Sequence, residues 1–295
     1  MEPVLLAPDQ GERVSDRAER TVLVLADTQQ VAVTWSRYAV GERGPGPHVH
    51  RRHADAFSVL AGSLVFGLGP GAAETVEAAA GSLVLVPAGV VHTFGNEGPG
   101  EARFLNVHAP GMGFGEYLCA LRDGRKEDAR RFDTYDPPGD GGRPASDVLV
   151  RGPGEGETIA VGPARTTLVV EASDGDGTFS LADTDLPPRF QGPPLHRHEA
   201  FVDVLYVLAG TPTVTLDDEP REARPGSFAL VAPGTAHTFS NAGDEPARAL
   251  NLMAPGGFEQ SLKEVAHATG DASPDPQLLA SIASKYDFEA VVQPY

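Results

Sequence analysis

The chain has 295 residues, of which 41% are hydrophobic and 22% charged, values typical of a globular protein and sufficient for two domains with separate cores. The formal net charge of −18 at pH 7 argues against nucleic acid or an anionic membrane as a partner, because no basic stripe is available to bind phosphates. A single cysteine excludes an internal disulfide and a cysteine-based zinc site. The N-terminus lacks a signal-like pattern and no long apolar stretch occurs, which together predict a cytoplasmic protein.

Short runs of β-branched and aromatic residues, bounded by Gly, Pro, Asn or Asp, dominate the chain and predict antiparallel strands. In the first half these strands are 21–25, 31–38, 57–60, 64–68 and 83–86. In the second half they are 167–171, 178–181, 204–208, 213–216 and 228–231. Helices are predicted at 114–121, 258–268 and 276–286. The pattern is that of an all-β chain with an antiparallel barrel or sandwich in each half.

Two sequence motifs occur twice. Residues 44–62 and 192–210, 148 positions apart, are identical at nine of 19 positions. A second pair, 81–96 and 226–241, is identical at nine of 16 positions with an offset of 145. An offset that changes by only three residues between the motifs indicates a duplicated domain with one shortened hairpin.

Each copy of the repeat carries three histidines and an aspartate at metal-ligand spacing. His48 and His50 are two residues apart on an extended segment, so they face the same side, and His92 follows a Gly-containing turn that starts a new strand. A lone histidine is more often a core or surface residue, but here the same positions recur in both copies. The predicted ligands are His48, His50, Asp55 and His92 in the first half, and His196, His198, Asp203 and His237 in the second.

Three imidazoles and one carboxylate suit a divalent Fe, Mn, Ni, Cu or Co ion, with zinc as an alternative. Four protein ligands leave positions open on an ion that prefers five or six, which a catalytic site requires. The donor set therefore predicts a catalytic rather than a structural metal.

The arrangement resembles the cupin family, whose motifs are G(x)5HxH(x)3–4E(x)6G and G(x)5PxG(x)2H(x)3N. The second motif of the first half fits at every position, whereas the second half has Ala232 where proline is usual and Pro233 one place later. The resemblance covers roughly residues 30–118 and 165–265. It implies a bicupin, with two tandem jelly-roll β-barrels and short helices after each. The expected domains are 1–121 and 148–295, joined by a Gly- and Pro-rich linker over 122–147.

The family's metal-binding glutamate is an aspartate in both copies, Asp55 and Asp203. Each carboxylate is expected to bind the metal, either directly or through water, and to act as the catalytic base; the alternative is a turn residue without a chemical role. His53 is interpreted as an extra ligand, a proton relay or a loop residue, and His108 as part of the cavity wall. Strand parity or loop position is expected to point Arg51 away from the metal, as with Arg52 and Arg197.

The strand-to-helix segments and the C-terminal tail resemble those of quercetin 2,3-dioxygenase-type cupins. That resemblance implies a metal-dependent dioxygenase acting on a small, flavonol- or enol-like substrate with O2, as a monomer or homodimer. Two alternatives remain open, because cupins host many reactions. One is a redox-neutral metal-dependent decarboxylase or isomerase; the other is a non-enzymatic protein that binds a metal or small ligand. The first half keeps the complete second motif and adds His53 and His108, so it is predicted to be the principal catalytic centre.

Overall fold

The computed structural model describes residues 2–269 and 275–291, which form two compact units. The N-terminal unit comprises Gly11–Glu155, and the C-terminal unit comprises the chain from Gly156 onward together with the residues up to Gln10. This division differs from the predicted one at both ends of the first half. Residues 2–10 belong to the C-terminal unit, and the predicted linker 122–147 belongs to the N-terminal unit.

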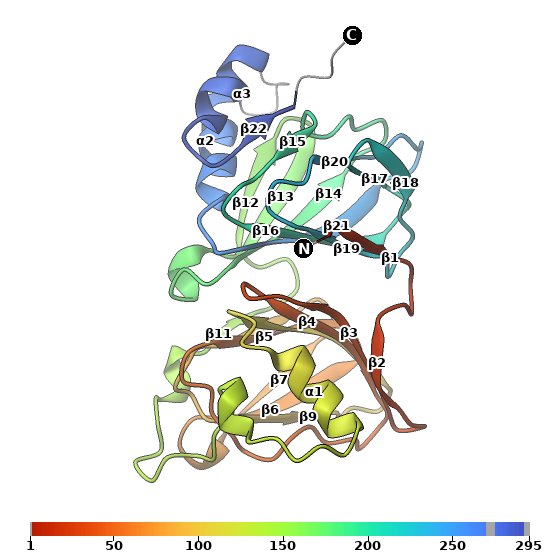
Figure 1. The fold of residues 1–295 in the computed structure, drawn as a ribbon. Helices are drawn as coiled ribbons and strands as arrows, with labels where there is room; N and C mark the ends of the chain where they lie inside the picture. Colours follow the sequence, from red (N-terminus) through yellow and green to blue (C-terminus); the bar gives the residue numbers. More distant parts are fainter. Residues whose placement is uncertain (1, 270–274, 292–295) are drawn as a thin grey trace. The chain divides into compact units, whose positions relative to one another are not determined.

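The exchange at the boundaries involves two short edge strands. Strand β1 (Val4–Leu6) pairs with β19 (Phe228–Val231), and Figure 1 shows it in dark red beside that strand. Strand β11 (Leu149–Arg151) pairs in the same way with β8 (Leu83–Val86) of the N-terminal unit. The larger sheet of the C-terminal unit thus includes β1, which precedes the N-terminal unit in the chain. The larger sheet of the N-terminal unit includes β11, which lies just before the C-terminal unit.

Two antiparallel sheets form the N-terminal unit. The larger has the strand order β11-β8-β5-β10-β4-β3-β2, and the smaller has the order β7-β6-β9. The chain passes between the sheets after β5, β7, β8 and β9, which makes the unit a jelly roll. Its remaining strands are β2 (Glu12–Asp16), β3 (Arg20–Asp27), β4 (Ala32–Tyr38), β5 (Ala54–Ala61), β6 (Ser63–Leu68), β7 (Glu74–Ala79), β9 (His92–Gly95) and β10 (Ala102–Ala109).

The C-terminal unit repeats this jelly roll. Its larger sheet has the order β1-β19-β16-β21-β14-β13-β12, and its smaller sheet has the order β18-β17-β20-β15-β22. The remaining strands are β12 (Glu157–Val161), β13 (Ala164–Val170), β14 (Ser180–Leu186), β15 (His196–Arg197), β16 (Val202–Ala209), β17 (Thr213–Leu216), β18 (Glu219–Glu222), β20 (His237–Ser240), β21 (Ala247–Ala254) and β22 (Glu289–Ala290). The predicted all-β fold of two tandem jelly rolls is confirmed.

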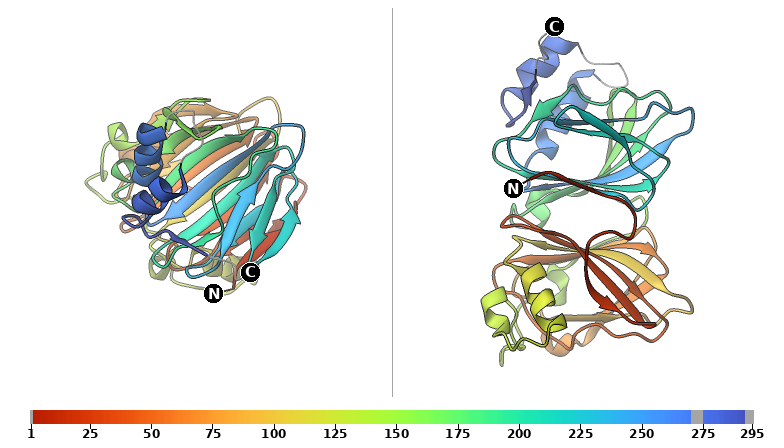
Figure 2. Two further views of the ribbon diagram at one scale, coloured as in Figure 1. Left: turned by 90° about the horizontal axis from the view of Figure 1, so that it is seen from above. Right: turned by 45° about the vertical axis from the view of Figure 1, so that its right-hand side comes forward.

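Short helices follow each jelly roll, as predicted. They are α1 (Phe114–Arg122), α2 (Glu259–Thr269) and α3 (Pro276–Ala283), with 3-10 turns η1 (Pro70–Ala72), η2 (Ala129–Phe132), η3 (Ala145–Asp147) and η4 (Ala172–Asp174). Helix α2 packs against β12 and α3 (Figures 1 and 2). Helix α3 ends at Ala283, before the predicted end at Tyr286, because the chain turns there and Asp287 adopts a left-handed conformation with φ of 47°. No helix in the described part of the chain is long and apolar enough to cross a membrane.

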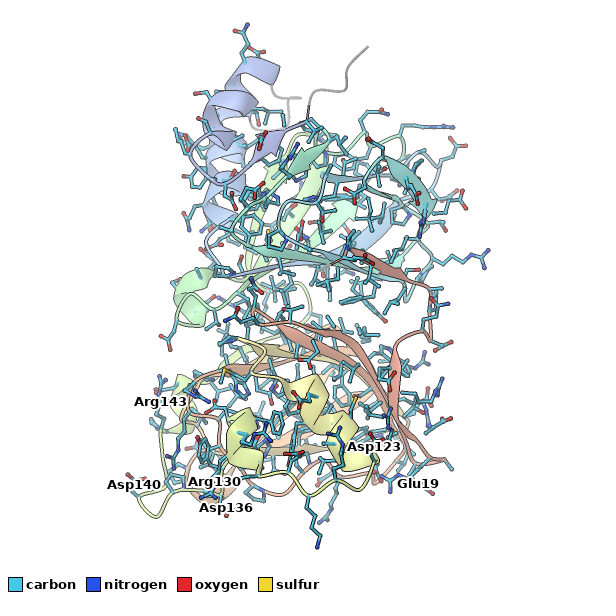
Figure 3. All side chains as sticks on the ribbon, in the orientation of Figure 1. Glu19, Asp123, Arg130, Asp136, Asp140 and Arg143 are labelled. Atoms are coloured by element: carbon cyan, nitrogen blue, oxygen red, sulfur yellow. The ribbon has the colours of Figure 1, made fainter. Side chains whose placement is uncertain are left out.

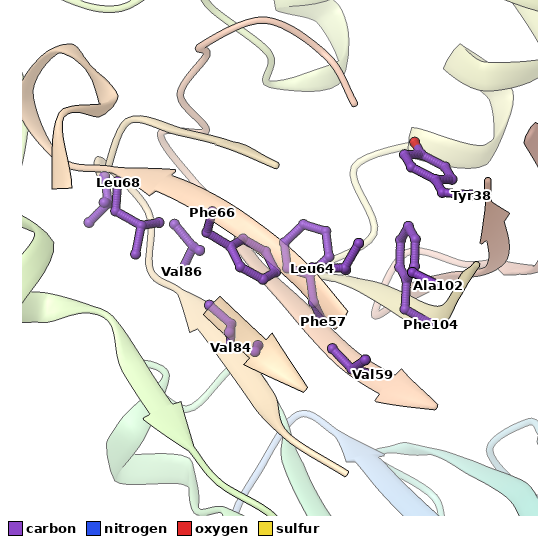
Figure 4. Close-up of a cluster of buried hydrophobic side chains, with 12 residues drawn as sticks. Tyr38, Phe57, Val59, Leu64, Phe66, Leu68, Val84, Val86, Ala102 and Phe104 are labelled. Carbon is purple, nitrogen blue, oxygen red and sulfur yellow. The ribbon is translucent and has the colours of Figure 1, made fainter. Parts of the chain in front are cut away.

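Aromatic side chains fill the core of the N-terminal unit. Phe57 is fully buried and its ring centroid lies 5.0 Å from that of Phe66 and 4.7 Å from that of Phe94. Figure 4 shows Phe57, Phe66 and Phe104 in one cluster with Tyr38. These rings are therefore core residues.

Candidate metal centres

The four predicted ligands of the N-terminal unit lie together at one end of the jelly roll. Asp55 lies on β5, His92 begins β9, and His48 pairs with His92 across an isolated β-bridge. One ligand atom from each of His48, His50, Asp55 and His92 lies within 4.8 Å of the others. All except His48 are almost completely buried, and His48 is partly exposed.

Backbone carbonyls fix the tautomer of each histidine in this cluster. Nδ1 of His48 lies 3.0 Å from Gly46 O, Nδ1 of His50 lies 2.9 Å from Asp133 O, and Nδ1 of His92 lies 3.1 Å from Val90 O. A carbonyl only accepts hydrogen bonds, so we assign the imidazole proton to Nδ1 in all three rings. The Nε2 lone pairs are then left to face one another, and Nε2 of His50 has no hydrogen-bond partner although it is buried.

The C-terminal unit repeats the three-histidine part of this arrangement, but the predicted ligand Asp203 is not within 4.8 Å of all three histidine nitrogens. Ligand nitrogens of His196, His198 and His237 lie within 4.8 Å of one another, and all three rings are buried. Their Nδ1 atoms face carbonyl oxygens two residues back for His196 and His237 (2.9 and 3.1 Å) and the carbonyl of Asp287 for His198. Two clusters that have diverged elsewhere thus keep the same orientation of all three rings.

The contacts of Asp55 and Asp203 indicate which kind of ligand each donor set fits. Asp55 Oδ2 lies 3.2 Å from Nε2 of His92, and Asp203 Oδ2 lies 3.3 Å from Nε2 of His237. If Nδ1 carries the proton, each pair brings two acceptors together, which is unfavourable unless a cation lies between them. Two ligand atoms about 2.1 Å from one ion are about 3.0 Å apart at a right angle and about 3.4 Å apart at the tetrahedral angle. The donor set therefore fits a divalent metal ion.

Burial keeps these groups in their metal-binding protonation states. Burial and the neighbouring His92 lower the pKa of His48 to about 4, and burial and His237 lower that of His196 to about 3. For Asp55 burial alone would raise the pKa, but the electrostatic effect of the neighbouring His108 outweighs it and lowers the pKa to about 2. At neutral pH these two imidazoles are neutral and Asp55 is a carboxylate, as metal coordination requires.

An asparagine on the neighbouring strand orients each carboxylate. Asn106 on β10 donates from Nδ2 to Asp55 Oδ1, and Asn251 on β21 donates from Nδ2 to Asp203 Oδ1. Each asparagine also lies within reach of the carbonyl one residue after the aspartate, at 3.3 and 3.2 Å. The same pairing in both units shows that each aspartate is held in place rather than left as a free turn residue. Sequence reasoning missed both asparagines, although the shared Leu-Asn pair of β10 and β21 carried the signal.

A second missed feature is a segment that folds back over each cluster after the helices. We call residues 128–136 the N-terminal strap and residues 284–291 the C-terminal strap. The carbonyl of Asp133 holds His50, and its carboxylate accepts the backbone N–H of Arg51 at 3.1 Å and of Arg52 at 2.7 Å. Residues 128–136 lie within the segment predicted to be a linker, but they contact the histidine cluster and are part of the site.

The C-terminal strap makes the same contacts 154 residues later. Asp287 accepts the backbone N–H of Glu199 at 3.0 Å and of Ala200 at 2.7 Å, and its carbonyl holds His198. Both aspartates adopt the left-handed conformation, with φ of 57° for Asp133 and 47° for Asp287. The only sequence signal is an aromatic residue followed by aspartate in each strap.

The N-terminal unit adds a chain of buried polar groups behind Asp55. His53 Nδ1 lies 3.0 Å from Asp133 Oδ2, His53 Nε2 lies 2.9 Å from His108 Nδ1, and His108 Nε2 lies 2.9 Å from Asn106 Oδ1. The C-terminal unit has apolar residues at the two histidine positions, namely Phe201 and Met253. His108 is therefore hydrogen-bonded between His53 and Asn106, and His53 in turn lies beside Asp133 of the strap.

The remaining motif residues build the scaffold. The turn glycines Gly89 and Gly234 have φ of 89° and 82° and donate to the carbonyls of His50 and His198 at 2.6 Å. This turn is the same in both units, so the shifted proline at Pro233 does not alter it. Asn96 donates to the carbonyls of Tyr38, Ala39 and Gly100 and closes the loop after β9.

A cavity of about 500 Å³ opens beside the N-terminal cluster. Its lining includes His48, Arg51, Tyr117, Thr134 and Tyr135, together with strap residues 128–130 and 136. Figure 3 labels Arg130 and Asp136 on this strap. Arg51 also lines this cavity, where the strap pairs with Val49 and the Arg51 guanidinium carbon lies 4.0 Å from the centroid of the Tyr135 ring.

Comparison with known proteins places this geometry in a family. A curated relative, an uncharacterized protein from Methanocaldococcus jannaschii, is 34% identical over 61 residues, 21% of this chain and 49% of that protein. The match thus spans about half of the relative's length.

Several solved structures share the fold at low sequence identity. The protein Ylba from E. coli has a TM-score of 0.62 at 12% identity, covering 85% of this chain and 90% of that one. A putative glyoxylate-induced protein from Pseudomonas aeruginosa has a TM-score of 0.58 at 15% identity, covering 79% and 80%. Oxalate decarboxylase from Bacillus subtilis has a TM-score of 0.57 at 16% identity, covering 85% and 76%. A family model described as a cupin domain matches residues 34–108 and 183–253, one match in each unit. The chain therefore belongs to the cupin superfamily as a bicupin.

Proposed function

We propose that the protein is a metal-dependent dioxygenase that oxidises a small enol- or flavonol-like substrate at the N-terminal cluster. The observation that carries the proposal is the convergence of three Nε2 lone pairs and the Asp55 carboxylate beside a cavity that His48 lines. The oxygenase chemistry is supported by the resemblance of the strand-to-helix segments to quercetin 2,3-dioxygenase-type cupins.

The ligands would be His48, His50 and His92, with Asp55 bound directly or through water. A divalent Fe, Mn, Ni, Cu or Co ion held there would supply Lewis-acid activation of a substrate hydroxyl and the redox chemistry that O2 requires. In this proposal Asp203 and its three histidines form a second, divergent centre.

Asp55 is the candidate base. Its pKa is lowered to about 2, so it is ionised at neutral pH, and Asn106 holds one oxygen while the other faces the centre of the cluster. A carboxylate in this position can remove the proton from a substrate hydroxyl that enters from the His48 side. The His53–His108 chain connects to Asn106 from behind and supports its orientation.

The experiment is oxygen uptake by protein purified without added metal, with its metal content measured in parallel. Flavonols and β-diketones form the substrate panel, and the His50→Ala variant is the matched control for loss of the N-terminal cluster. We expect uptake that depends on substrate and is lost in that variant. A fully metallated protein that consumes no oxygen with any member of the panel would exclude the dioxygenase.

Redox-neutral decarboxylation is the second candidate, and one observation favours it. Arg51 brings a positive charge into the cavity that His48 lines, where it can hold a substrate carboxylate. Oxalate decarboxylase from Bacillus subtilis, which shares the fold, contains Mn(II) centres. Release of CO2 from small di- and keto-acids without oxygen uptake would select this reaction over the first.

A further inference from the structure

The two straps place different residues over equivalent histidines. Tyr135 pairs with Val49 in the N-terminal unit, and Glu289 pairs with Arg197 in the C-terminal unit. Val49 and Arg197 are equivalent in the repeat, so each strap runs beside its cluster in the same register. Thr134 and Phe288, which precede the paired residues, are therefore equivalent positions.

Phe288 covers the C-terminal cluster. Its ring lies parallel to that of His196, with 4.1 Å between centroids and 11° between planes, and its centroid lies 5.7 Å from that of His198. His196 is consequently only 4% exposed. A phenyl ring stacked on an imidazole excludes any ligand from that face.

Thr134 leaves the same face open in the N-terminal unit. It lines the cavity of about 500 Å³ together with His48, which is partly exposed there. Because threonine is smaller than phenylalanine, the N-terminal cluster has a cavity large enough for a small organic molecule where the C-terminal cluster has an aromatic ring.

The charged residues around the two clusters differ but do not by themselves select between them. Arg51 lines the N-terminal cavity, with its guanidinium over the Tyr135 ring. The equivalent residues of the C-terminal unit are Glu199 and Glu289, both exposed. The cavity lining also carries Arg130, Asp128 and Asp136, so its formal charges balance, and Glu289 lies 3.8 Å from the Arg197 side chain.

We infer that this strap position determines which cluster admits a substrate, and that the substrate is a molecule small enough to enter the cavity of about 500 Å³ beside His48. Thr134 leaves the N-terminal cluster accessible, and Phe288 closes the C-terminal cluster, which then serves to hold a metal without turnover. The inference rests on the proposed function because it assumes that both clusters bind metal. Access to the imidazoles can be measured without that assumption.

The test exchanges the two residues in the full chain. The probe is 4-nitrocatechol, an anionic bidentate oxygen ligand whose absorbance changes on binding a metal, and metal content is measured on the same samples. We expect one probe per wild-type chain with both clusters loaded, two for Phe288→Thr, and none for Thr134→Phe. Phe288→Leu keeps an apolar cover and serves as the control for loss of packing, with one probe bound.

A second readout uses metal-free protein. Diethyl pyrocarbonate modifies unprotonated imidazoles, and peptide mapping reports His48 and His196 separately. We expect Phe288→Thr to raise the modification rate of His196 several-fold and Thr134→Phe to lower that of His48 by a similar factor. Equal reactivity of the two histidines in wild type, or no change in either variant, overturns the inference. A chain that takes up no metal would refute the proposed function alone, because the modification rates still report access.

Discussion

Replacing Asp133 by alanine tests whether the N-terminal strap positions a metal ligand. The carboxylate is fully buried and accepts two backbone N–H groups, those of Arg51 and Arg52. A hydrogen bond to a charged group is worth about 1.5–3 kcal/mol, so two contribute about 3–6 kcal/mol, and water that reaches the exposed arginine backbone reduces this to about 2–4 kcal/mol. Alanine in the left-handed conformation at φ of 57° adds about 1 kcal/mol.

The Asp133→Ala substitution is thus expected to destabilise the docked strap by about 3–5 kcal/mol in total. The carbonyl of residue 133 in this strap accepts from Nδ1 of His50 at 2.9 Å. A group that orients a metal-bound histidine in this way changes metal affinity by about 10–100-fold, which is the expected loss. The assay is competition with a chromophoric chelator in a His198→Ala background, where only the N-terminal cluster remains. Asp133→Asn retains an acceptor oxygen and tolerates the left-handed conformation, so it is expected to restore most of the affinity.

Asp287→Ala is the matched variant for the other unit. It removes the equivalent contacts to Glu199 and Ala200 and is expected to weaken only the C-terminal cluster, measured in a His50→Ala background. An unchanged dissociation constant for Asp133→Ala would refute the positioning role. A protein that loses metal equally from both clusters in either variant would point to general unfolding instead.

Three further predictions follow from the same geometry. Asp55→Asn keeps three imidazoles and is expected to retain metal but lose turnover by about 10²–10⁴-fold, whereas Asp203→Asn changes turnover little; full activity of Asp55→Asn would exclude a base role. Metal-free protein is expected to lose stability in urea unfolding as the pH falls from about 6.5 to about 4, by at most about 1.4 kcal/mol per pH unit for His48. The pKa of His48 is about 4 in the folded protein and about 6.5 in the unfolded chain, so between these pH values only the unfolded chain binds the proton and is stabilised by it. A free energy of unfolding that rises on acidification would contradict this. Phe57→Ala removes a fully buried ring and is expected to cost about 3–5 kcal/mol of unfolding free energy, whereas Val40→Ala, 61% exposed, serves as a near-neutral control.

The sequence by itself determined the two jelly rolls and the histidine sets that meet in each. His-x-His on an extended segment puts two imidazoles on one side by strand parity, and a Gly-containing turn begins the strand that brings the third. Both are local rules, and the repeat applies them twice at offsets of 148 and 145, so they could be read without a structure. The contact of Arg51 with Tyr135 could not be read in this way, because it is made by a distant segment.

Tertiary structure decided what surrounds the ligands. The straps carry no hydrophobic periodicity and only a two-residue signal, so nothing local indicates that Asp133 and Asp287 fold back 82–88 residues to cap the backbone beside His50 and His198. The exchange of β1 and β11 is likewise a pairing between distant segments, with no trace in either short strand. Whether Thr134 opens a cavity and Phe288 closes a cluster depends on strap register, which is set by these long-range contacts. Local patterns therefore define the donor atoms, and contacts between distant segments define access to them.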